Sequence, residues 1–175
     1  MDHKVIAITG PTGSGKSTIS LALAKKFDRC VYLDVDHVKH MVVSGFSYTI
    51  GKGGEKVWHY SEWKQVGESV GILCANFLQN DFGVVVGGYM YEEAWRELEK
   101  QVDLTHKFLL LPSKETIKYR DVERDSKYTM GDFAIKEHFD YIEQKEIFRD
   151  FAVIDSTDQS VDQTLETLIT HIENH

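Results

Sequence analysis

Gly10-Pro11-Thr12-Gly13-Ser14-Gly15-Lys16-Ser17 is the stretch that decides the fold of this chain. It matches the phosphate-loop pattern G-x-x-x-x-G-K-[ST] at every fixed position. Residues 5–8, just before it, form a short apolar run that predicts a buried strand, and residues 18–27, after it, have the apolar spacing of a helix. The alternative is a chance match to a glycine-rich turn, but the flanking strand and helix favour a phosphate loop.

The residue types of this loop indicate what it binds. Between a strand and a helix, the backbone N–H groups of the loop and the positive end of the helix converge on one anion. Lys16 is then expected to reach the outer phosphates and to act in catalysis, while the Ser17 hydroxyl coordinates Mg²⁺. We expect the phosphates of ATP to be bound by Gly10, Pro11, Thr12, Gly13, Ser14, Gly15, Lys16, Ser17 and Thr18.

Composition restricts the class of protein. A chain of 175 residues that is 42% hydrophobic predicts a single domain, residues 1–175, with a substantial core. Its net charge of -8 disfavours nucleic acid and a membrane surface as partners. We find no apolar run near the roughly 20 residues of a membrane span and no secretory signal at the N-terminus. The two cysteines, not in a C-x-x-C arrangement, fit reduced core thiols, so we expect a cytoplasmic protein.

Two carboxylates follow the second apolar run of the chain, at Asp34 and Asp36. In an open parallel sheet the carboxyl ends of the strands face the ligand crevice, and residues two apart in an extended chain project on one side. We predict that Asp34 acts on Mg²⁺ through water and that Asp36 accepts a proton from a substrate hydroxyl. The alternative is that Asp36 only caps a helix at residues 37–43.

Two further segments border the predicted crevice. Residues 44–60 are rich in glycine and aromatic residues, typical of a substrate-side insertion, and their rings either pack on a substrate or cover the core. Residues 82–86 are a continuous apolar run, typical of a central strand, and end in Gly87 and Gly88 without a carboxylate. The backbone can approach a ligand closely there, and more of the task of holding Mg²⁺ falls on Asp34.

Arg120 and Arg124 lie four residues apart on a predicted helix for which Ser113 is the expected N-cap. We predict that they close over the nucleotide phosphates and neutralise charge during transfer. The alternative is a solvated face paired with neighbouring acidic residues. Residues 125–132 are predicted to form a lid. None of the eight histidines is assigned to a site, because His37 and His40 have no evident third metal ligand.

The motifs, in this order, resemble those of the small single-domain P-loop kinases that phosphorylate metabolite hydroxyls: shikimate kinase, gluconate kinase and chloramphenicol phosphotransferase. The chain looks most like chloramphenicol phosphotransferase, over nearly its whole length. The matching landmarks are residues 10–18, residues 33–36, residues 84–88, the pair Arg120 and Arg124, and residues 153–157.

This resemblance implies a three-layer α/β/α fold with a five-stranded parallel sheet in the order 2-3-1-4-5. It also implies a magnesium-associated role for Asp34 and a substrate-binding, base-like role for Asp36. Gly87 and Gly88 are similar to the glycines that bind substrate in shikimate kinase, and differ from the acidic residues that chloramphenicol phosphotransferase has there.

Together these features predict an ATP-dependent kinase that uses Mg²⁺ and transfers the γ-phosphoryl group to a hydroxyl of a small polar metabolite. One alternative is a nucleoside or nucleotide-sugar kinase. Another is a nucleotide-dependent switch that transfers nothing, which the missing acid at Gly87 would favour. The identity of the acceptor, the oligomeric state and the choice between ATP and GTP stay open at this point.

Overall fold

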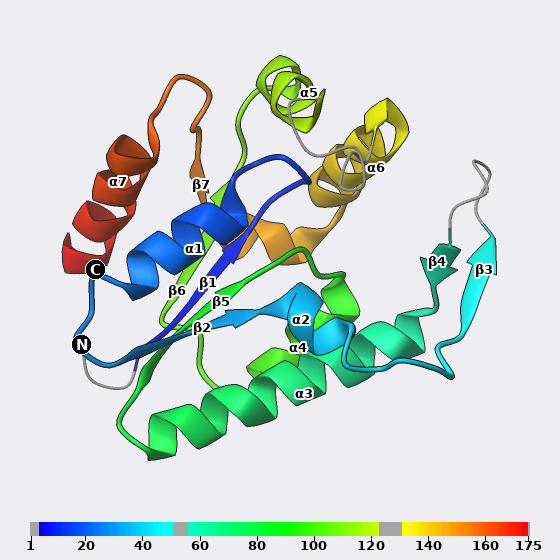
Figure 1. Cartoon of the computed structure of the whole chain (residues 1–175), viewed down its shortest axis with the longest axis horizontal. Coiled ribbons are helices and arrows are strands. Elements are labelled where there is room, and N and C mark those ends of the chain that lie inside the picture. The colour runs from blue at the N-terminus through cyan, green and yellow to red at the C-terminus, as the bar shows by residue number, and fades with distance from the viewer. Residues whose placement is uncertain (1–3, 51–55, 123–130, 175) are drawn as a thin grey trace.

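The structure of the protein is a computed structural model, and it describes residues 4–50, 56–122 and 131–174. A parallel sheet lies at its centre with helices on both faces (Figure 1). The five strands of this sheet, in chain order, are β1 (Val5–Thr9), β2 (Cys30–Asp34), β5 (Gly83–Gly87), β6 (His106–Leu110) and β7 (Ala152–Ile154).

All four neighbouring strand pairs are parallel, and their order across the sheet is β2-β5-β1-β6-β7. Numbering only these five strands along the chain gives 2-3-1-4-5, so the predicted fold class and strand order are confirmed. At one edge β2 pairs with β5 in a register that sets Asp34 against Gly87. The carboxyl ends of β1, β2 and β5 therefore lie side by side. A ligand crevice in a parallel sheet is expected at the carboxyl ends of its strands.

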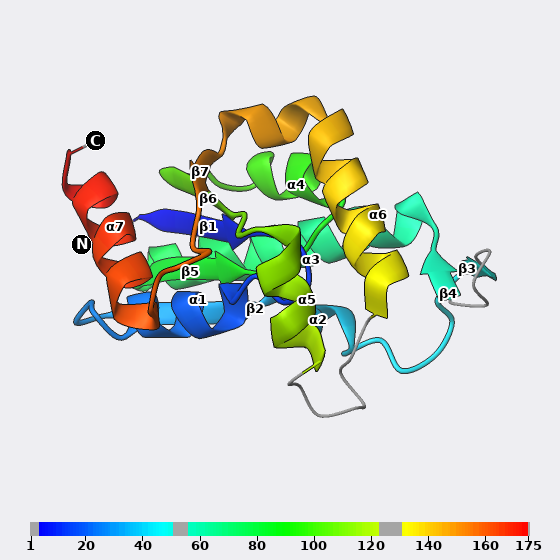
Figure 2. The same ribbon diagram turned by 90° about the horizontal axis from the view of Figure 1, so that it is seen from above.

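Helices cover both faces of the sheet. They are α1 (Lys16–Ala24), α2 (Val35–Lys39), α3 (Tyr60–Gln79), α4 (Glu92–Glu99), α5 (Lys114–Val122), α6 (Gly131–Gln144) and α7 (Val161–Asn174), with a short 3-10 helix at Glu146–Asp150. In Figure 2, α1 and α4 lie on opposite sides of the sheet. None of the helices in the described ranges is long and apolar enough to cross a bilayer.

The side chains of β1 alternate between the two faces of the sheet, and helices cover both faces. Val5 and Ala7 pack into the cluster formed with α3 and α4, whereas Ile6 and Ile8 pack into the cluster formed with α1 and α7. All four side chains are buried. Successive side chains of a strand point to opposite faces, so a continuous apolar run can exist only where both faces are covered.

Side-chain hydrogen bonds cap the starts of two helices. Ser160 and Gln163 form a reciprocal capping box before α7: the Ser160 N–H donates to Gln163 Oε1 at 2.9 Å and the Gln163 N–H to Ser160 Oγ at 3.2 Å. Before α5, Ser113 Oγ accepts the Thr116 N–H at 3.2 Å.

Two elements differ from the sequence-based expectation. Helix α2 begins at Val35, not at residue 37, because the side chain of Asp34 accepts the Asp36 N–H and so caps the helix itself. The capping role considered for Asp36 therefore belongs to Asp34. Within the predicted insertion, β3 (Tyr48–Ile50) and β4 (Lys56–Trp58) form an antiparallel hairpin, consistent with the β-branched and aromatic residues in both segments.

Close packing of α3 on α4 gives a stability prediction. A Cβ added to Gly67 on α3 would lie 2.1 Å from the backbone oxygen of Ala94 on α4 and 2.6 Å from its Cα. Gly67→Ala should therefore lower the free energy of unfolding by about 1–3 kcal/mol, since the helices must move apart. The gain of about 1 kcal/mol in helix propensity only partly offsets this cost.

Urea unfolding followed by circular dichroism measures this effect. Gly71→Ala is the matched variant on the same helix, because its added Cβ would meet side-chain atoms of Gln101, Cγ at 2.7 Å and Cβ at 2.8 Å, and the backbone of α4 only at 3.4 Å, at the Cα of Leu98. Gly71→Ala should cost less than Gly67→Ala. Equal stability of the Gly67 variant and the parent would contradict the close packing.

Candidate active site

The phosphate-loop residues connect the end of β1 to the start of α1. Gly10, Gly13 and Gly15 have φ angles of +154°, +78° and +90°, values that glycine adopts with little cost. A Cβ at Gly10 would also lie 2.3 Å from the backbone oxygen of Leu110 on β6. These glycines therefore let the loop fold tightly against the sheet between the end of β1 and the N-terminus of α1.

At one end of the loop, the peptide unit between Pro11 and Thr12 contacts two side chains. Lys16 Nζ donates a hydrogen bond to the backbone oxygen of Pro11 at 3.2 Å. The Thr12 N–H donates to Nδ1 of His138, on α6, at 3.1 Å. The ammonium group of Lys16, on α1, and the imidazole of His138, on α6, thus contact the same peptide unit.

A pocket of about 300 Å³ lies at the other end of the loop. Its volume is at the lower end of the range for ligand pockets. Arg120 borders it and donates from Nη2 to the backbone oxygen of Ser156 at 3.1 Å. The pocket is lined by Ser14, Gly15, Thr18, Ile19, Arg120, Ser156, Gln159, Ser160, Val161 and Thr164. The phosphate loop, helix α5 and the segment after β7 thus border the same pocket.

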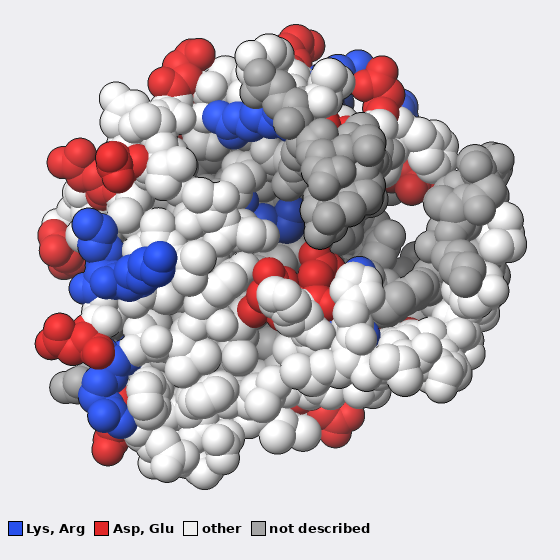
Figure 3. Space-filling model, in the orientation of Figure 1, with Lys and Arg blue, Asp and Glu red and all other residues white. Residues whose placement is uncertain are grey.

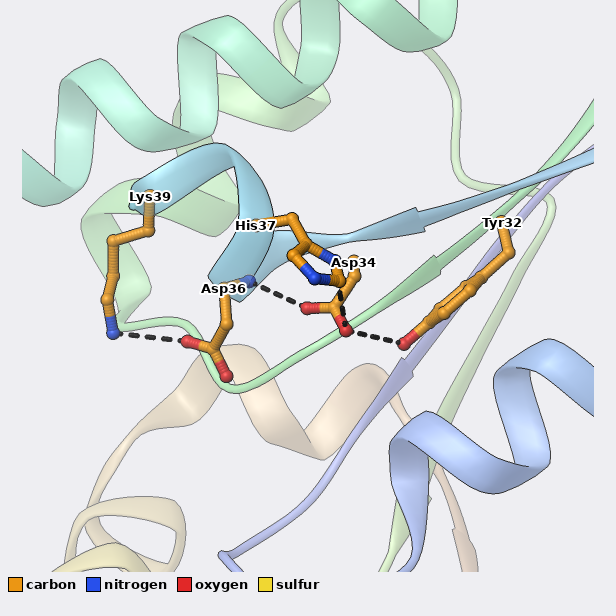
Figure 4. Close-up of polar contacts among 5 residues, drawn as sticks. All are labelled: Tyr32, Asp34, Asp36, His37 and Lys39. Carbon is orange, nitrogen blue, oxygen red and sulfur yellow. Dashed lines mark hydrogen bonds and ion pairs between the residues drawn. The ribbon is translucent and has the colours of Figure 1, made fainter. Parts of the chain in front are cut away.

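Asp34 stands at the centre of a polar network at the end of β2 (Figure 4). The Tyr32 hydroxyl donates to Asp34 Oδ2 at 3.0 Å, the Asp36 N–H donates to Oδ1 at 2.9 Å, and His37 Nδ1 lies 3.6 Å from Oδ2. Burial and the charge of Asp34 raise the pKa of Tyr32, and a side-chain hydrogen bond with Ser17 acts in the opposite direction. Tyr32 therefore joins Asp34 to the last residue of the phosphate-loop pattern.

Asp36 lies beside this network but is more open. Its Oδ1 accepts a hydrogen bond from Lys39 Nζ at 3.1 Å, and its side chain is 56% exposed, against 19% for Asp34. Lys39 in turn lies 5.3 Å above the ring of Trp63. In Figure 4 the carboxylates of Asp34 and Asp36 project from the same end of α2. Asp36 is thus accessible to a ligand and is held by a cation.

His138 lies between the phosphate loop and the residues of α2. Its ring stacks on Tyr89, with 3.9 Å between centroids and 15° between planes. Burial, together with the positive charge of Lys16 and of Lys39, lowers the pKa of His138 to about 4, whereas Asp36 acts to raise it. At neutral pH the imidazole is therefore uncharged, as acceptance of the Thr12 N–H by Nδ1 requires.

The charged groups gather where the crevice is expected. In Figure 3, acidic side chains lie near the centre of the face, over the start of α2, beside a recess that holds a basic side chain. Elsewhere on this face the basic and acidic side chains of the described residues alternate and form no continuous basic surface.

Comparison with solved structures identifies the fold. The chain aligns with a sugar kinase from Janibacter sp. HTCC2649 at a TM-score of 0.75 and 16% identity, covering 97% of this chain and 94% of that one. The fold is that of the small P-loop kinases. A tunicamycin resistance protein from Deinococcus radiodurans is also similar (TM-score 0.68, 16% identity, coverage 97% and 95%), as is a gluconokinase from Sinorhizobium meliloti 1021 (TM-score 0.66, 15% identity, coverage 98% and 94%).

No protein-family model matches the sequence, and no curated protein matches it. The likeness to small P-loop kinases therefore rests on the shape of the chain, over nearly its whole length.

In this P-loop kinase fold, the residues expected to hold Mg²⁺ fit that ion. Ser17 offers a hydroxyl and Asp34 a carboxylate, the oxygen ligands that Mg²⁺ prefers. Tyr32 donates to Asp34 and lies close enough to Ser17 for that hydroxyl to lower its pKa. Among the described residues no three His, Cys, Asp or Glu side chains form a metal-binding group. A magnesium ion held through few protein groups, nucleotide phosphates and water is compatible with this arrangement.

The other predicted residues are distributed as follows. Gly87 and Gly88 are buried at the end of β5, where an added Cβ would lie 2.4 Å from Ser20 Oγ and 2.5 Å from Val35 Cβ, respectively. Close packing thus accounts for both glycines, and a substrate contact by them stays a prediction. Arg124 and most of the predicted lid, residues 125–132, lie outside the described residues.

The sequence patterns do not predict three residues of the site. The position of Tyr32 indicates a contact with Asp34, because it lies two positions before Asp34 on the same strand and so projects to the same side. The position of Lys39, three residues after Asp36 on a helix, indicates a contact with Asp36 more weakly. No sequence pattern indicates the contact of His138, because it is 126 residues from its partner Thr12 and only folding brings them together.

The lowered pKa of His138 predicts a pH effect on stability. In the unfolded chain His138 has the ordinary pKa of about 6.5, so between pH 6.5 and 4 the unfolded state binds more protons than the folded state. The free energy of unfolding should fall as the pH falls through this window, by about 3 kcal/mol from this group. His138→Phe keeps a ring against Tyr89 but cannot take a proton, so it should lack this share of the loss. Urea titrations at pH 7 and pH 4.5 on both proteins test this, and parallel pH profiles would contradict it.

Proposed function

We propose that the protein is an ATP-dependent kinase that transfers the γ-phosphoryl group to a hydroxyl of a small polar molecule. The proposal rests chiefly on the arrangement along the phosphate loop. A nucleoside-sized pocket bordered by Arg120 lies at one end, and the peptide unit that contacts Lys16 lies at the other, on the side of Asp36. A nucleotide laid along the loop would direct its outer phosphates toward Asp36.

Phosphoryl transfer passes through a loose transition state that carries negative charge on the phosphoryl oxygens, so positioning and charge neutralisation supply most of the catalysis. In the proposed reaction Lys16 and Arg124 neutralise this charge, and Arg120 contacts the nucleotide from the border of the pocket. Ser17 and Asp34 would hold Mg²⁺, which neutralises charge between the outer phosphates when bound. Asp36 orients the acceptor hydroxyl and accepts its proton.

The nature of the acceptor is supported by the surroundings of Asp36. Lys39 contacts Asp36, and both lie on α2, which the irregular segment 40–47 and the β3–β4 hairpin follow in the chain. Polar groups on a short helix next to an irregular segment suit a hydroxyl-rich metabolite. The names sugar kinase and gluconokinase among the similar structures favour the same class of acceptor.

A metabolite-pool screen tests the proposed function. The purified protein is incubated with ATP, Mg²⁺ and a pool of sugars, sugar acids, nucleosides and nucleotide sugars, and products are sought by mass as acceptors that gain one phosphate. The Lys16→Ala variant is the negative control. A nucleoside product would favour the nucleoside kinase alternative. Slow ATP hydrolysis that no acceptor stimulates would contradict transfer and favour a nucleotide-dependent switch.

A further inference from the structure

The carboxylate of Asp36 is held through one of its two oxygens. Its Oδ1 accepts a hydrogen bond from Lys39 Nζ at 3.1 Å, whereas its Oδ2 accepts none from the part of the chain that the structure describes. The backbone of Asp36 is fixed as well, because its N–H donates to Asp34 Oδ1 at 2.9 Å. One carboxylate oxygen is therefore occupied, and the other is open to a ligand (Figure 4).

Lys39 is itself held by a second helix. Its ammonium lies 5.3 Å from the centre of the Trp63 ring on α3, within the range of a cation–π contact. Trp63 is buried and packs edge-to-face on Tyr91, with 5.1 Å between ring centroids. Exposed ion pairs are weak partly because two long side chains must be kept in one geometry. Lys39 is only 18% exposed and already packs on Trp63, so its contact with Asp36 requires less additional ordering.

The pair of Asp36 and Lys39 lies in the same region as the lysine of the phosphate loop. Besides burial, three charges act on the pKa of His138, those of Lys16, Asp36 and Lys39. All three side chains therefore lie near this one ring. Lys16 is the loop residue that reaches the outer phosphates in this motif. The open oxygen of Asp36 is thus on the side of the loop where the proposed transfer takes place.

We propose that Lys39 is a positioning residue for phosphoryl transfer, which holds Oδ1 of Asp36 so that Oδ2 meets the acceptor hydroxyl. This inference rests on the proposed function, in which Asp36 is the base of a kinase. In that step the acceptor oxygen forms a bond to the γ-phosphorus, and the hydroxyl proton passes to Oδ2 of Asp36. The bond between the γ-phosphorus and the bridging oxygen breaks, and ADP leaves with its electron pair. A carboxylate that rotated freely would be correctly oriented for only part of the time, so the rate depends on Lys39.

Kinetics of Lys39 variants, with the acceptor found by screening, test this inference. Lys39→Met keeps an apolar stem against Trp63 but has no donor, so it should lower kcat about tenfold through misplacement of the carboxylate. The loss is smaller than that expected for Asp36→Asn, because the proton acceptor itself remains. KM for the acceptor and the affinity for ATP should each change by less than about threefold, since positioning acts on the transfer step. Lys39→Arg keeps a charged donor and should stay within about threefold of the parental kcat.

The double variant separates positioning from a direct contact with substrate. If Lys39 acts only through the carboxylate of Asp36, Lys39→Met should lower kcat by less than about a further twofold in the Asp36→Asn protein. Losses that multiply, to about 10³-fold, would mean that Lys39 acts independently of Asp36, and the inference would fail. An increase of KM for the acceptor, or a loss of ATP affinity, of more than about tenfold in Lys39→Met would overturn it as well, because Lys39 would then bind a substrate itself.

Lys100→Met is the matched control. Lys100 also lies three residues after a carboxylate along its helix, and its Nζ lies 2.8 Å from Glu97 Oε2, but its side chain is 63% exposed. It follows the end of α4 that leads to the start of β6, whereas the phosphate loop follows the carboxyl end of the neighbouring parallel strand β1. Loss of this pair should leave kcat and both KM values within about twofold of the parent, as is usual for surface substitutions.

A measurement that needs no turnover and keeps Lys39 tests the contact itself. In ¹⁵N-edited spectra of the lysine side chains, Asp36→Asn should move the Nζ resonance of Lys39 and leave that of Lys100 in place. An unchanged Lys39 resonance would mean that the two side chains are not paired, and the inference would fail while the nucleotide site stood. A parent protein that transfers phosphate to no acceptor would instead overturn the proposed function, and the spectra would still decide whether Lys39 holds Asp36.

Discussion

Lys16→Ala is expected to lower the rate of phosphoryl transfer by on the order of 10³-fold, the range for loss of one preorganised group that stabilises transition-state charge. Lys16 begins α1, and its ammonium reaches back across the loop to the backbone oxygen of Pro11. A coupled assay of ADP release with the acceptor found by screening measures the loss, and calorimetry measures the accompanying weakening of ATP binding.

Lys25→Ala is the matched control for this loss. Lys25 is exposed and follows the last turn of the same helix, so its removal changes net charge and helix composition without touching the loop. It should keep turnover within about twofold, as is usual for surface substitutions. Turnover of Lys16→Ala within tenfold of the parent would contradict the assigned role of the lysine.

Asp36→Asn should lower turnover by roughly 10²-fold or more and leave the affinity for ATP nearly intact, because it removes a proton acceptor and keeps the shape of the side chain. The structure makes this separation of effects testable. The side chain of Asp36 is 56% exposed, whereas the phosphate loop makes its own contacts through backbone groups and Lys16. Turnover and ATP affinity are measured in the same assays as above.

Asp28→Asn, in the exposed turn that precedes β2 and so lies at the opposite end of that strand from Asp34, is the control for loss of one carboxylate far from the loop. It should leave both turnover and ATP affinity unchanged. Unchanged turnover in Asp36→Asn with the true acceptor would remove Asp36 from the role of base. Equal losses of turnover and ATP affinity would instead mean that Asp36 helps to bind the nucleotide.

Local sequence patterns were sufficient wherever the interacting groups are close along the chain. The apolar runs of β1 and β5 predicted buried strands, and Ser113 predicted the cap of α5, as the structure has them. The start of α2 was predicted two residues late, because the pattern Asp-x-Asp contains two competent caps. Only backbone conformation decides which one acts, and Asp34, in an extended conformation, accepts the Asp36 N–H.

The sequence by itself determined the phosphate loop, the elements on both sides of it and, through resemblance, the order of the sheet. These depend on glycine conformations, apolar periodicity and spacing, which are local properties. The tertiary structure alone decided that Tyr32 joins Asp34 to Ser17, that Arg120 borders the pocket, and that His138 contacts Thr12. Such contacts join side chains from separate elements, and their geometry is fixed only when the helices pack against the sheet.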